Sequence, residues 1–447
     1  MTARVREFNL FLRDYVNLNQ TRINTLQTRV GSLDDFLVED STLADVVADG
    51  LIPQGSFAHK TIVRPYSGND FDADVLLPIE EQDEWEPKKY TIQLQKALEA
   101  SSRYVGKTVL KKRCVTVEYA NDFHIDVVPF ITRGDGNTYI TNRTDNEYVR
   151  CDPVAFTTWV EDCARTTNGH LIRVIRLVKF LRDRSSIQVP SVVLAALLAE
   201  RVHSFAGVDY YTNVATTLVA LLENLDDYIG PMTTRPWVDD RIGQNLADRL
   251  TETGFKNLQS QVKTWARKMR EALDADSADS VEKWRTVFGD NFGAENKEQG
   301  LLASAQVDTY EKSAAPGEQW LDRDYGIPIR LNPRYGFRVV GRAAGTMRAR
   351  SRPRPLSASG NHVRTGRDLN FTVEGCTVPE PFDVYWKVRN AGEEAASRKN
   401  FRGEIRKEGL RITETSNFPG NHWVQAWIVK DGVAVATDVQ DVTIVSR

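Results

Sequence analysis

Two aspartates alternate with apolar residues at the start of a hydrophobic run, in the segment Phe71–Ile79 (FDADVLLPI). Residues i and i+2 of a strand share one face, so this spacing predicts that Asp72 and Asp74 point the same way. Two unpaired carboxylates at this distance repel each other, and burying them is costly. A divalent cation between them removes that cost, and Mg²⁺ prefers carboxylate oxygens. The segment therefore predicts a sheet with a metal site on one face.

A third aspartate, Asp126, lies in the apolar segment FHIDVVPF. If that strand pairs beside the first, three carboxylates converge. This arrangement suits two-metal phosphoryl transfer, in which one ion activates an attacking hydroxyl and the other holds the triphosphate and leaving group. Asp70 offers a second Asp-x-Asp register with Asp72, but we favour Asp72 and Asp74 because the second acid directly precedes the buried run. Surface acids on an edge strand would explain the apolar flanks poorly.

A Gly-Ser pair and two histidines lie close to these acids in the sequence. Gly55 would let the backbone approach a phosphate closely. Ser56 and neighbouring backbone N–H groups could then bind the β- and γ-phosphates. His124 shares a strand face with Asp126 and could touch a nucleotide, although a packed or solvent-facing histidine fits equally well. We assign no role to His59.

The composition limits the classes of protein that the chain can belong to. A length of 447 residues predicts two or three domains. The net charge of −3 argues against a protein that coats nucleic acid, so any phosphate recognition must be local. The four cysteines form no CxxC pair, which argues against zinc, against a disulfide framework and for a reducing compartment. The polar N-terminus and the lack of an apolar run of ~18–20 residues predict a cytoplasmic protein without a membrane partner.

The hydrophobic periodicity divides the chain into three regions. Up to about residue 288, helical patterns surround a strand-rich stretch at 51–130, and the strongest helix is expected at His170–Arg184. Residues 290–325 lose periodicity, which indicates a linker. From about Ile327 the pattern becomes period two in several short pieces, which predicts an all-β domain, most simply a sandwich. The pair Asp431-Gly432 within it predicts a hairpin turn.

Several motifs together carry a family resemblance. A Gly-Ser pair, an Asp-x-Asp before an apolar strand and a lone Asp on a later strand resemble the DNA polymerase β-type nucleotidyltransferases. The segments GSFAHKTIVRP, DFDADVLL and HIDVVP, with LVKFLRDR, PSVVLAALL and KWRTVFGDNFG, resemble the bacterial cyclic-GMP–AMP-synthase-like enzymes, the CD-NTase or SMODS group. This resemblance covers roughly residues 5–295, and the motif set is specific although GS or DxD alone is weak.

The C-terminal region carries a second resemblance. Its segments YWKVRNAGEEA, FRGEI and TETSNFPGNHWVQAWIVKDGVAVATD resemble the adenylyl/guanylyl-cyclase and SMODS C-terminal sensor (AGS-C) domain, over about 327–447. The fold class that follows is α+β. We expect a polymerase β-type mixed sheet with helices at about 40–150, preceded by an N-terminal helix, and a helical lobe at 150–295. A linker at 296–326 would then lead into the β-rich, sandwich-like sensor domain at 327–447.

The first resemblance implies a role for seven residues. Carried over position by position, these are the metal ligands Asp72, Asp74 and Asp126, the phosphate-binding turn Gly55 and Ser56, the triphosphate contact Lys179, and Ser191 near those phosphates. In this pattern Asp126 also helps to deprotonate the acceptor hydroxyl.

Two of these assignments have plain structural alternatives. Lys179 follows Arg173 and Arg176 and precedes Arg182 at a spacing of three, so all four could form a solvated helix face. Ser191 follows a proline at a predicted helix start and could be only a cap.

The C-terminal region also contains a basic run and several tryptophans. The run consists of Arg334, Arg338, Arg342, Arg348, Arg350, Arg352 and Arg354. Charge runs are usually solvated, although arginines beside Tyr335 and Phe337 could hold an oligonucleotide by phosphate contact and stacking. We expect Trp386 and Trp423 in the sandwich core rather than stacked on a ligand.

The function that the resemblance implies is nucleotidyl transfer with a two-ion Mg²⁺ or Mn²⁺ site. The substrates would be nucleoside triphosphates, with ATP first and dATP as an alternative. The product would be a cyclic di- or oligonucleotide messenger of anti-phage defence (CBASS), passed to a separate effector protein. One alternative is synthesis of linear oligonucleotides. Another is a nucleotide-binding sensor with little turnover, against which the presence of all three acids argues.

Overall fold

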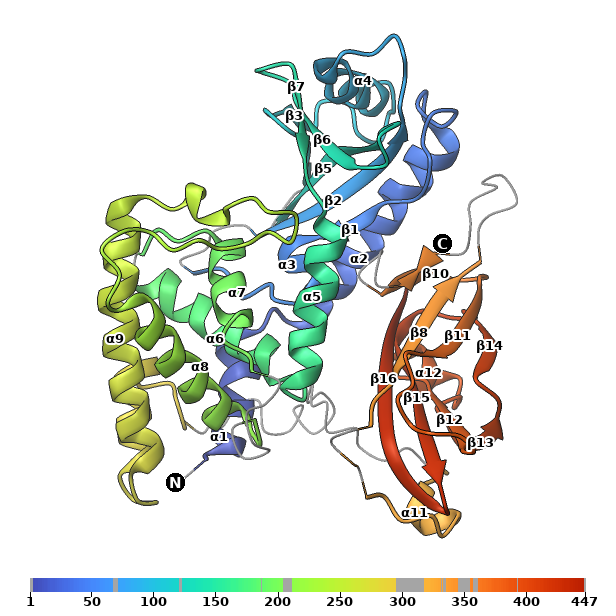
Figure 1. The fold of residues 1–447 in the computed structure, drawn as a ribbon. Coiled ribbons are helices and arrows are strands. Elements are labelled where there is room, and N and C mark those ends of the chain that lie inside the picture. The colour runs from blue at the N-terminus through green and yellow to red at the C-terminus, as the bar shows by residue number, and fades with distance from the viewer. Residues whose placement is uncertain are drawn as a thin grey trace.

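The structure is a computed structural model of the chain. It describes residues 3–66, 71–119, 123–185, 187–203, 211–294, 317–330, 332, 335–344, 354–356, 361–391 and 393–445. Its ribbon has three parts: a mixed sheet with its helices, a helical lobe, and a β-rich C-terminal part (Figure 1).

The acid-bearing segments form neighbouring strands of a seven-stranded sheet with the order β1-β2-β5-β4-β3, in which β6 pairs with β5 and β7 with β6. The strands are β1 (Ile52–Gln54), β2 (Phe71–Glu80), β3 (Thr108–Leu110), β4 (Val115–Tyr119), β5 (Phe123–Thr132), β6 (Thr138–Asn142) and β7 (Glu147–Arg150). Strands β2 and β5 are parallel, and Asp74 lies opposite Asp126 in their register. The predicted pairing of these two strands is therefore confirmed. Our sequence analysis did not predict β6 and β7 as strands.

The two faces of β2 differ in burial, as the alternation predicts. Phe71, Ala73 and Val75 point into a hydrophobic core that also receives helix α4 (Pro87–Glu99). The opposite face starts with Asp72, which is exposed, and Asp74, which is partly buried, and only then becomes apolar at Leu76.

The other described elements before residue 294 are helices and helical turns. They are α1 (Val5–Phe11), α2 (Gln20–Asp35), α3 (Gly55–Ala58), α5 (Pro153–Thr166), α6 (His170–Arg184), α7 (Ser191–Ala199), α8 (Val214–Ile229), α9 (Glu252–Asp274) and α10 (Ser280–Phe288), with π-helical turns at Leu12–Val16 and Phe36–Asp40 and a 3₁₀ turn at Leu246–Arg249. The helix predicted at His170–Arg184 is confirmed residue for residue as α6.

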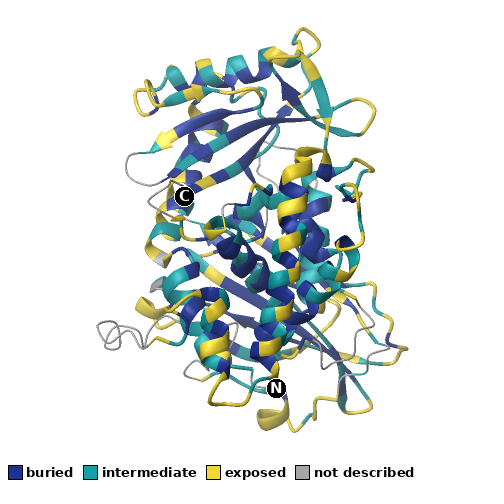
Figure 2. Ribbon diagram, turned by 90° about the vertical axis from the view of Figure 1, so that its left-hand side faces the viewer, coloured by how far each residue is buried: buried dark blue, intermediate teal, exposed yellow. Residues whose placement is uncertain are grey.

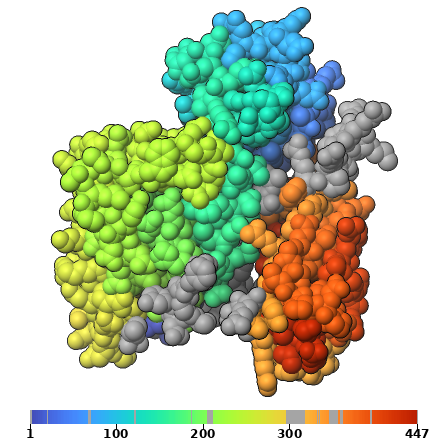
Figure 3. Space-filling view, in the orientation of Figure 1, coloured from blue at the N-terminus to red at the C-terminus, as the bar shows by residue number. Residues whose placement is uncertain are grey.

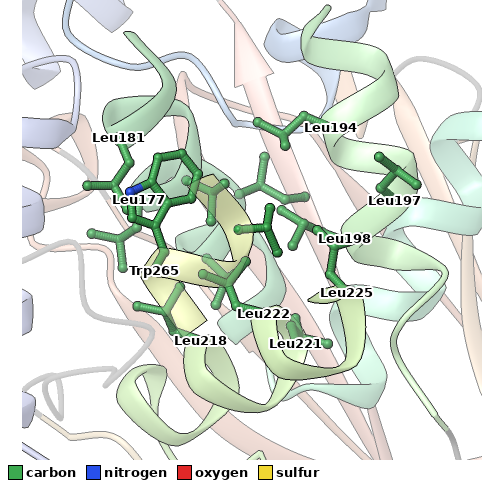
Figure 4. Packing of buried hydrophobic residues seen from close by; sticks show 14 of the residues in the cluster. Leu177, Leu181, Leu194, Leu197, Leu198, Leu218, Leu221, Leu222, Leu225 and Trp265 are labelled. Carbon is green, nitrogen blue, oxygen red and sulfur yellow. The ribbon is translucent and has the colours of Figure 1, made fainter. Parts of the chain in front are cut away.

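The helical lobe is held by a continuous apolar core. Figure 4 shows its centre, formed by Leu177 and Leu181 of α6, Leu194, Leu197 and Leu198 of α7, Leu218, Leu221, Leu222 and Leu225 of α8, and Trp265 of α9. Helix α7 is buried from Val193 to Ala199, which explains why its sequence is apolar on every side. In Figure 2 the outer helices instead alternate buried and exposed stripes. Among the described helices, none combines the length and apolar character that a membrane span requires.

The C-terminal part is a sandwich of two sheets, with the strand orders β10-β16-β15-β12-β13 and β14-β11-β8-β9. The strands are β8 (Arg338–Ala343), β9 (Arg354–Pro355), β10 (His362–Arg364), β11 (Asp368–Glu374), β12 (Asp383–Arg389), β13 (Arg402–Glu408), β14 (Arg411–Thr415), β15 (Gly420–Lys430) and β16 (Val433–Val445), with short helices α11 (Leu321–Asp324) and α12 (Glu393–Ser397). One core contains side chains of both sheets, among them Phe371 of β11 and Trp386 of β12. The predicted all-β sandwich is confirmed. So is the hairpin turn at Asp431-Gly432, where both residues have positive φ.

Trp423 departs from the prediction that it lies in the sandwich core. Its neighbour Val424 contributes to that core, and alternate residues of a strand face opposite ways. Trp423 therefore lies on the outer face of the five-stranded sheet. Residues 318–324, within the segment predicted as a linker, cover this face through Leu321. Residues 296–316 of that segment lie outside the described residues, and the boundaries at 295 and 327 stay predictions.

The C-terminal part packs against the first part of the chain beside α5 and α2 (Figure 1, Figure 3). Arg364 forms ion pairs with Asp34 and Asp35. Asn361 donates from its side-chain amide to Glu161 of α5 at 2.9 Å. The His362 ring lies 5.2 Å from the ring of Phe57 in α3, the short helix that begins at the Gly-Ser pair. Polar and aromatic contacts thus join the sensor-like sandwich to the region of the predicted site.

Candidate active site

Three aspartates lie on one face of the sheet, on adjacent strands. Asp74 on β2 is directly opposite Asp126 on β5, and Asp72 is opposite His124. Asp72 is exposed, whereas Asp74 and Asp126 are partly buried. The structure therefore brings together the three acids that the sequence analysis singled out. Asp70 lies outside the described residues.

Like charges at this face perturb the central carboxylate. Burial raises the pKa of Asp74 to about 7, and the negative charges of Asp72 and Asp126 add to the effect. A group of acids with this property is stabilised by a cation. Oxygen donors of this kind are the ligands that Mg²⁺ and Mn²⁺ prefer, so the residues fit a divalent ion by chemistry and proximity.

The acids do not form a closed ligand set as they stand. Within the described part of the chain, no three His, Cys, Asp or Glu side chains are arranged to hold a metal ion. The negative charges of Asp72 and Asp126 nevertheless contribute to the raised pKa of Asp74. Carboxylate side chains reorient by χ rotation, so the three acids can turn toward a cation that binds between them. Ligation by these aspartates stays a prediction.

Asp126 has two partners that the sequence analysis missed. The Lys111 ammonium lies 3.3 Å from its Oδ1, and the Thr116 hydroxyl donates to the same oxygen. Thr116 lies opposite Asp126 on β4, and Lys111 lies in the turn between β3 and β4. The basic triplet KKR at 111–113, between two short strands, was the available signal. These two residues fix the orientation of the third carboxylate.

The Gly-Ser turn lies directly against Asp74. Gly55 starts α3 with φ +58°, a conformation that favours glycine. A Cβ at this position would lie 3.0 Å from Asp74 Oδ2, which is tighter than ordinary contact. Gln54, just before the turn, pairs with Asp74 across β1 and β2. The turn and the acids thus form one constellation, and phosphate binding by Gly55 and Ser56 stays a prediction.

Lys179 is buried rather than part of a solvated helix face, so that alternative is wrong for this residue. The residue is 5% exposed, and its ammonium donates to the Thr61 carbonyl at 2.8 Å. Burial lowers the pKa of Lys179 to about 8, with a further contribution from Arg182. Its positive charge in turn lowers the pKa of Asp74. Lys179 therefore binds the loop after α3 and lies close enough to Asp74 to influence its pKa. Its contact with a triphosphate stays a prediction.

Ser191 is the first residue of α7, and its hydroxyl accepts a hydrogen bond from Arg182 at 2.8 Å. The N-cap is Pro190, and no side-chain cap hydrogen bond is present there. The alternative that Ser191 acts as the cap is therefore wrong. A role near the phosphates stays a prediction.

His59 and two arginines of the basic run have partners within the protein. His59 is buried, and its Nε2 lies 3.1 Å from the Thr157 hydroxyl, while burial lowers its pKa to about 4. This is a packing position, consistent with the absence of an assigned role. Arg338 pairs with Asp162, and Arg342 with Glu374. The other arginines of the run lie outside the described residues or have no described side chain, namely Arg334, Arg348, Arg350, Arg352 and Arg354.

Two family models match the chain. A Second Messenger Oligonucleotide or Dinucleotide Synthetase (SMODS) domain matches residues 1–164. An Adenylyl/Guanylyl and SMODS C-terminal sensor domain matches residues 317–445. The described Gly-Ser turn and the three aspartates fall inside the first match, and the sandwich falls inside the second.

Curated relatives resemble part of the chain. A c-di-GMP synthase of Roseivirga ehrenbergii is 23% identical over 247 residues, which are 49% of this chain and 64% of the relative. A cyclic AMP-AMP-AMP synthase of an Acinetobacter species is 25% identical over 285 residues, 61% of this chain and 80% of the relative. The match to the first of these spans less than two thirds of its length.

Solved structures share the fold. The structure of CdnC with ATP from E. coli MS115-1 superposes with a TM-score of 0.52 at 20% identity, over 64% of this chain and 98% of that chain. The CD-NTase CdnG of Bradyrhizobium diazoefficiens in complex with GTP gives a TM-score of 0.51 at 19% identity, over 64% of this chain and 94% of that chain. These likenesses support the predicted polymerase β-type fold.

Proposed function

We propose that the chain is a SMODS-type nucleotidyltransferase with a C-terminal sensor domain and that it joins nucleoside triphosphates into a cyclic di- or oligonucleotide. The matches of the two family models to residues 1–164 and 317–445 support this proposal. One observation carries the proposal: a glycine turn with positive φ lies against Asp74, the central member of a group of three like-charged acids on adjacent strands. A divalent cation would neutralise the acids, and the phosphates of a nucleotide bound to that cation would lie beside the glycine turn.

In this proposal the three aspartates ligate the metal ions, and Asp126 has a second role. Asp72, Asp74 and Asp126 would hold Mg²⁺ or Mn²⁺. When bound, the ions supply activation of the attacking hydroxyl and charge neutralisation at the triphosphate. Asp126, oriented by Thr116 and Lys111, would accept the proton of the attacking hydroxyl. The oxygen of that hydroxyl then forms a bond to the α-phosphorus, and pyrophosphate leaves.

The turn and the helix behind it would position the donor nucleotide. Gly55 leaves room for a phosphate beside Asp74, and Ser56 and the backbone of the turn would donate hydrogen bonds to it. The ammonium of Lys179 donates to the Thr61 carbonyl in the loop after α3, and its charge lowers the pKa of Asp74. It would stabilise the negative charge that collects there when the triphosphate binds.

The nature of the product rests on the relatives. The similar synthases are named for cyclic di- and trinucleotides, which supports a cyclic product over the linear alternative. The solved structures with ATP and GTP support ribonucleotide substrates. We extend the proposal to a defence signal that a separate effector protein reads, on the strength of the family resemblance.

The test is product analysis with purified protein. Each radiolabelled NTP and dNTP, singly and in pairs, is incubated with Mg²⁺ or Mn²⁺, treated with phosphatase and resolved by chromatography and mass spectrometry. A phosphatase-resistant species with the mass of a cyclic oligonucleotide, absent for Asp74→Asn, supports the proposal. A ladder of linear products supports the first alternative and overturns cyclisation. Nucleotide binding without any product, across all pairs and both metals, contradicts the proposal and favours a sensor with little turnover.

A further inference from the structure

A cavity of about 270 Å³ lies on the outer face of the five-stranded sheet, away from the aspartates. One wall is the sheet itself, through β12, β15 and β16, and the other is the segment 318–329 that covers it. Leu321 of this segment packs with Ile405 and Trp427 of the sheet, which fixes the two walls relative to each other. The cavity is thus formed by the described part of the C-terminal unit alone.

Indole rings make up much of the lining. Trp423 and Trp427 lie on one face of β15, and Trp320 approaches from the covering segment. Indoles present large flat apolar surfaces and favour stacking on a planar ring. Between the two sheet tryptophans, the Gln425 amide donates to the Thr437 hydroxyl at 3.1 Å. The Thr437 hydroxyl also donates to the Ala426 carbonyl at 2.9 Å, so it can meet a ligand only as an acceptor. The lining therefore combines aromatic surface with an amide and a hydroxyl oxygen at the edge of the space for a heteroaromatic ring.

A charged cluster closes one side of this cavity. Lys387 and Arg389 share the outer face of β12, and their side chains are 2% and 9% exposed. Both pair with the carboxylate of Glu318, at 2.6 and 3.3 Å, and the Glu318 side chain is 1% exposed. The Lys387 ammonium lies 4.4 Å from the centre of the Trp320 ring and 5.7 Å from that of Trp423. Two buried cations thus face a single carboxylate beside the aromatic walls.

The balance of charge indicates what the cavity accepts. Buried cations need anionic partners, and here Glu318 is the carboxylate that pairs with both of them. Their other hydrogen bonds go to neutral carbonyls, that of Gln319 for Lys387 and those of Asn390 and Phe401 for Arg389. A cationic ligand would meet Lys387 already against the indoles, so the cluster disfavours it. An anionic group is attracted, and Glu318 occupies the position that it would take. Phosphate and carboxylate groups make charge-assisted hydrogen bonds to such pairs of cations.

We propose that this cavity binds a planar heteroaromatic ring that carries a phosphate or carboxylate, of the size of a nucleoside monophosphate. The ring would lie against Trp320, Trp423 and Trp427, with Gln425 and Thr437 at its edge. The anion would contact Lys387 and Arg389 in place of the Glu318 carboxylate. This site is separate from the aspartates, and the inference does not depend on the proposed catalytic function.

The first experiment measures binding by calorimetry to the full chain with Asp72→Ala and Asp74→Ala and with EDTA present, which weakens nucleotide binding at the proposed active site. The probes are AMP and GMP, the matching nucleosides, and inorganic phosphate. We expect a nucleoside monophosphate to bind more tightly than its nucleoside and more tightly than phosphate, because both halves of the cavity then contribute. Phosphate binding equal to that of AMP and GMP would show an anion site only and would overturn the proposal.

Paired variants then locate the site. Lys387→Met should weaken monophosphate binding by about tenfold or more and leave nucleoside binding nearly unchanged. The matched control is Lys407→Met, which removes an exposed lysine whose carboxylate partner, Asp383, lies at 2.7 Å. Trp320→Leu should weaken both nucleoside and monophosphate binding by about tenfold, whereas Trp237→Leu removes an exposed indole elsewhere and should change neither.

One further variant tests whether the ligand anion displaces the Glu318 carboxylate, through the direction in which it changes binding. Glu318→Gln removes the internal competitor and should tighten monophosphate binding several-fold, with circular dichroism confirming that the variant is folded. Weaker binding by folded Glu318→Gln would mean that the carboxylate holds the ligand, which overturns the displacement. Binding that responds to neither Lys387→Met nor Trp320→Leu, or no binding by the folded protein, overturns the site. Trp320 is only partly buried, so its variant stays informative if Lys387→Met fails to fold.

Discussion

Two groups of charged side chains in the described part of the chain differ in how their charges are balanced. At the sheet face Asp72, Asp74 and Asp126 carry like charges, and burial with these neighbours raises the pKa of Asp74 to about 7. In the C-terminal sandwich Glu318 instead faces Lys387 and Arg389, in a cluster that is buried more deeply than the aspartates.

The difference separates the two kinds of site. A like-charged group destabilises the fold by itself, so its presence indicates a ligand of opposite charge. In the second cluster two cations share one internal carboxylate, so each charge has an opposite partner and removing one partner is costly. The repulsion within the first group therefore indicates that a cation binds there. In the second group, an internal carboxylate occupies the position proposed for the anion of a ligand. The predictions below test this contrast through activity and through stability, from the largest expected effect to the smallest.

The first prediction concerns Asp74→Asn, which should affect activity and stability in opposite directions. Loss of a metal ligand should lower the rate of nucleotide transfer by about 10³-fold or more. In EDTA the same variant should be more stable than wild type by about 1 kcal/mol, because the repulsion at Asp74 is relieved. Product formation and chemical denaturation measure the two effects. Asp83→Asn, on the exposed turn after β2, is the matched control and should change neither. An active or destabilised Asp74→Asn would contradict the assignment.

The second prediction concerns Lys387→Met in the sandwich, where removing a charge should lower stability instead of raising it. Lys387→Met should destabilise the C-terminal unit by roughly 3 kcal/mol, because it removes one partner from a buried ion pair. Lys407→Met removes a lysine from an exposed pair with Asp383 and should cost less than about 1 kcal/mol. Denaturation monitored by tryptophan fluorescence compares the two variants directly. Equal stability of both would show that Glu318 does not need Lys387, and the contrast with the aspartates would fail.

The third prediction separates the strain of the glycine turn from its contact with Asp74. Gly55→Ala places a Cβ 3.0 Å from Asp74 Oδ2, whereas Gly106→Ala meets nothing within 4 Å. Both glycines have positive φ, so both variants carry a strain cost of about 1 kcal/mol. Only Gly55→Ala should also lower activity, by about 50-fold, because it moves the central carboxylate. Similar activities of the two variants would mean that the close approach to Asp74 has no catalytic role.

The sequence predicted the aspartate group because strand alternation is local information. Asp72 and Asp74 on alternate residues, followed by an apolar run, determine a shared face before any tertiary contact is known. Their proximity to Asp126 then needed only the pairing of two strands. The same reasoning identified the sandwich from period-two segments and the helix at His170–Arg184 from its amphipathic spacing.

The rest depended on contacts between distant segments. Thr116 and Lys111 reach Asp126 only because β4 pairs with β5, and the basic triplet that contains Lys111 does not by itself indicate which acid it meets. Glu318 lies in a stretch without periodicity, which looked like a linker, and it meets Lys387 across 69 positions of sequence only after the sandwich forms. Trp423 was assigned to the core because it is aromatic and apolar, while the strand register places it on the outer face instead.

The last prediction concerns a carboxylate at the boundary of the two parts, with an expected effect of roughly 1–2 kcal/mol. Burial raises the pKa of Glu161 on α5 to about 7, although Arg165 and Lys60 oppose the shift. The folded protein then binds this proton more tightly than the unfolded chain does. The stability that Glu161 contributes is complete below its ordinary pKa of 4.5 and is lost as pH rises through about 7. Glu161→Gln should therefore match wild type at pH 4.5 and exceed it at pH 8 by roughly 1–2 kcal/mol.

Denaturation of wild type and Glu161→Gln across this pH range measures the difference directly, and Glu84→Gln at an exposed position serves as the matched control. Glu161 accepts a hydrogen bond from Asn361 of the sandwich, so its charge acts on the contact between the two parts. A gain that grows from pH 4.5 to pH 8 would place Glu161 with Asp74, whose pKa stays raised although Lys111 and Lys179 oppose the shift. A loss at pH 8 would instead show that Arg165 and Lys60 neutralise it, as Lys387 and Arg389 neutralise Glu318. The boundary between the sensor-like sandwich and the catalytic part would then be held by a compensated charge.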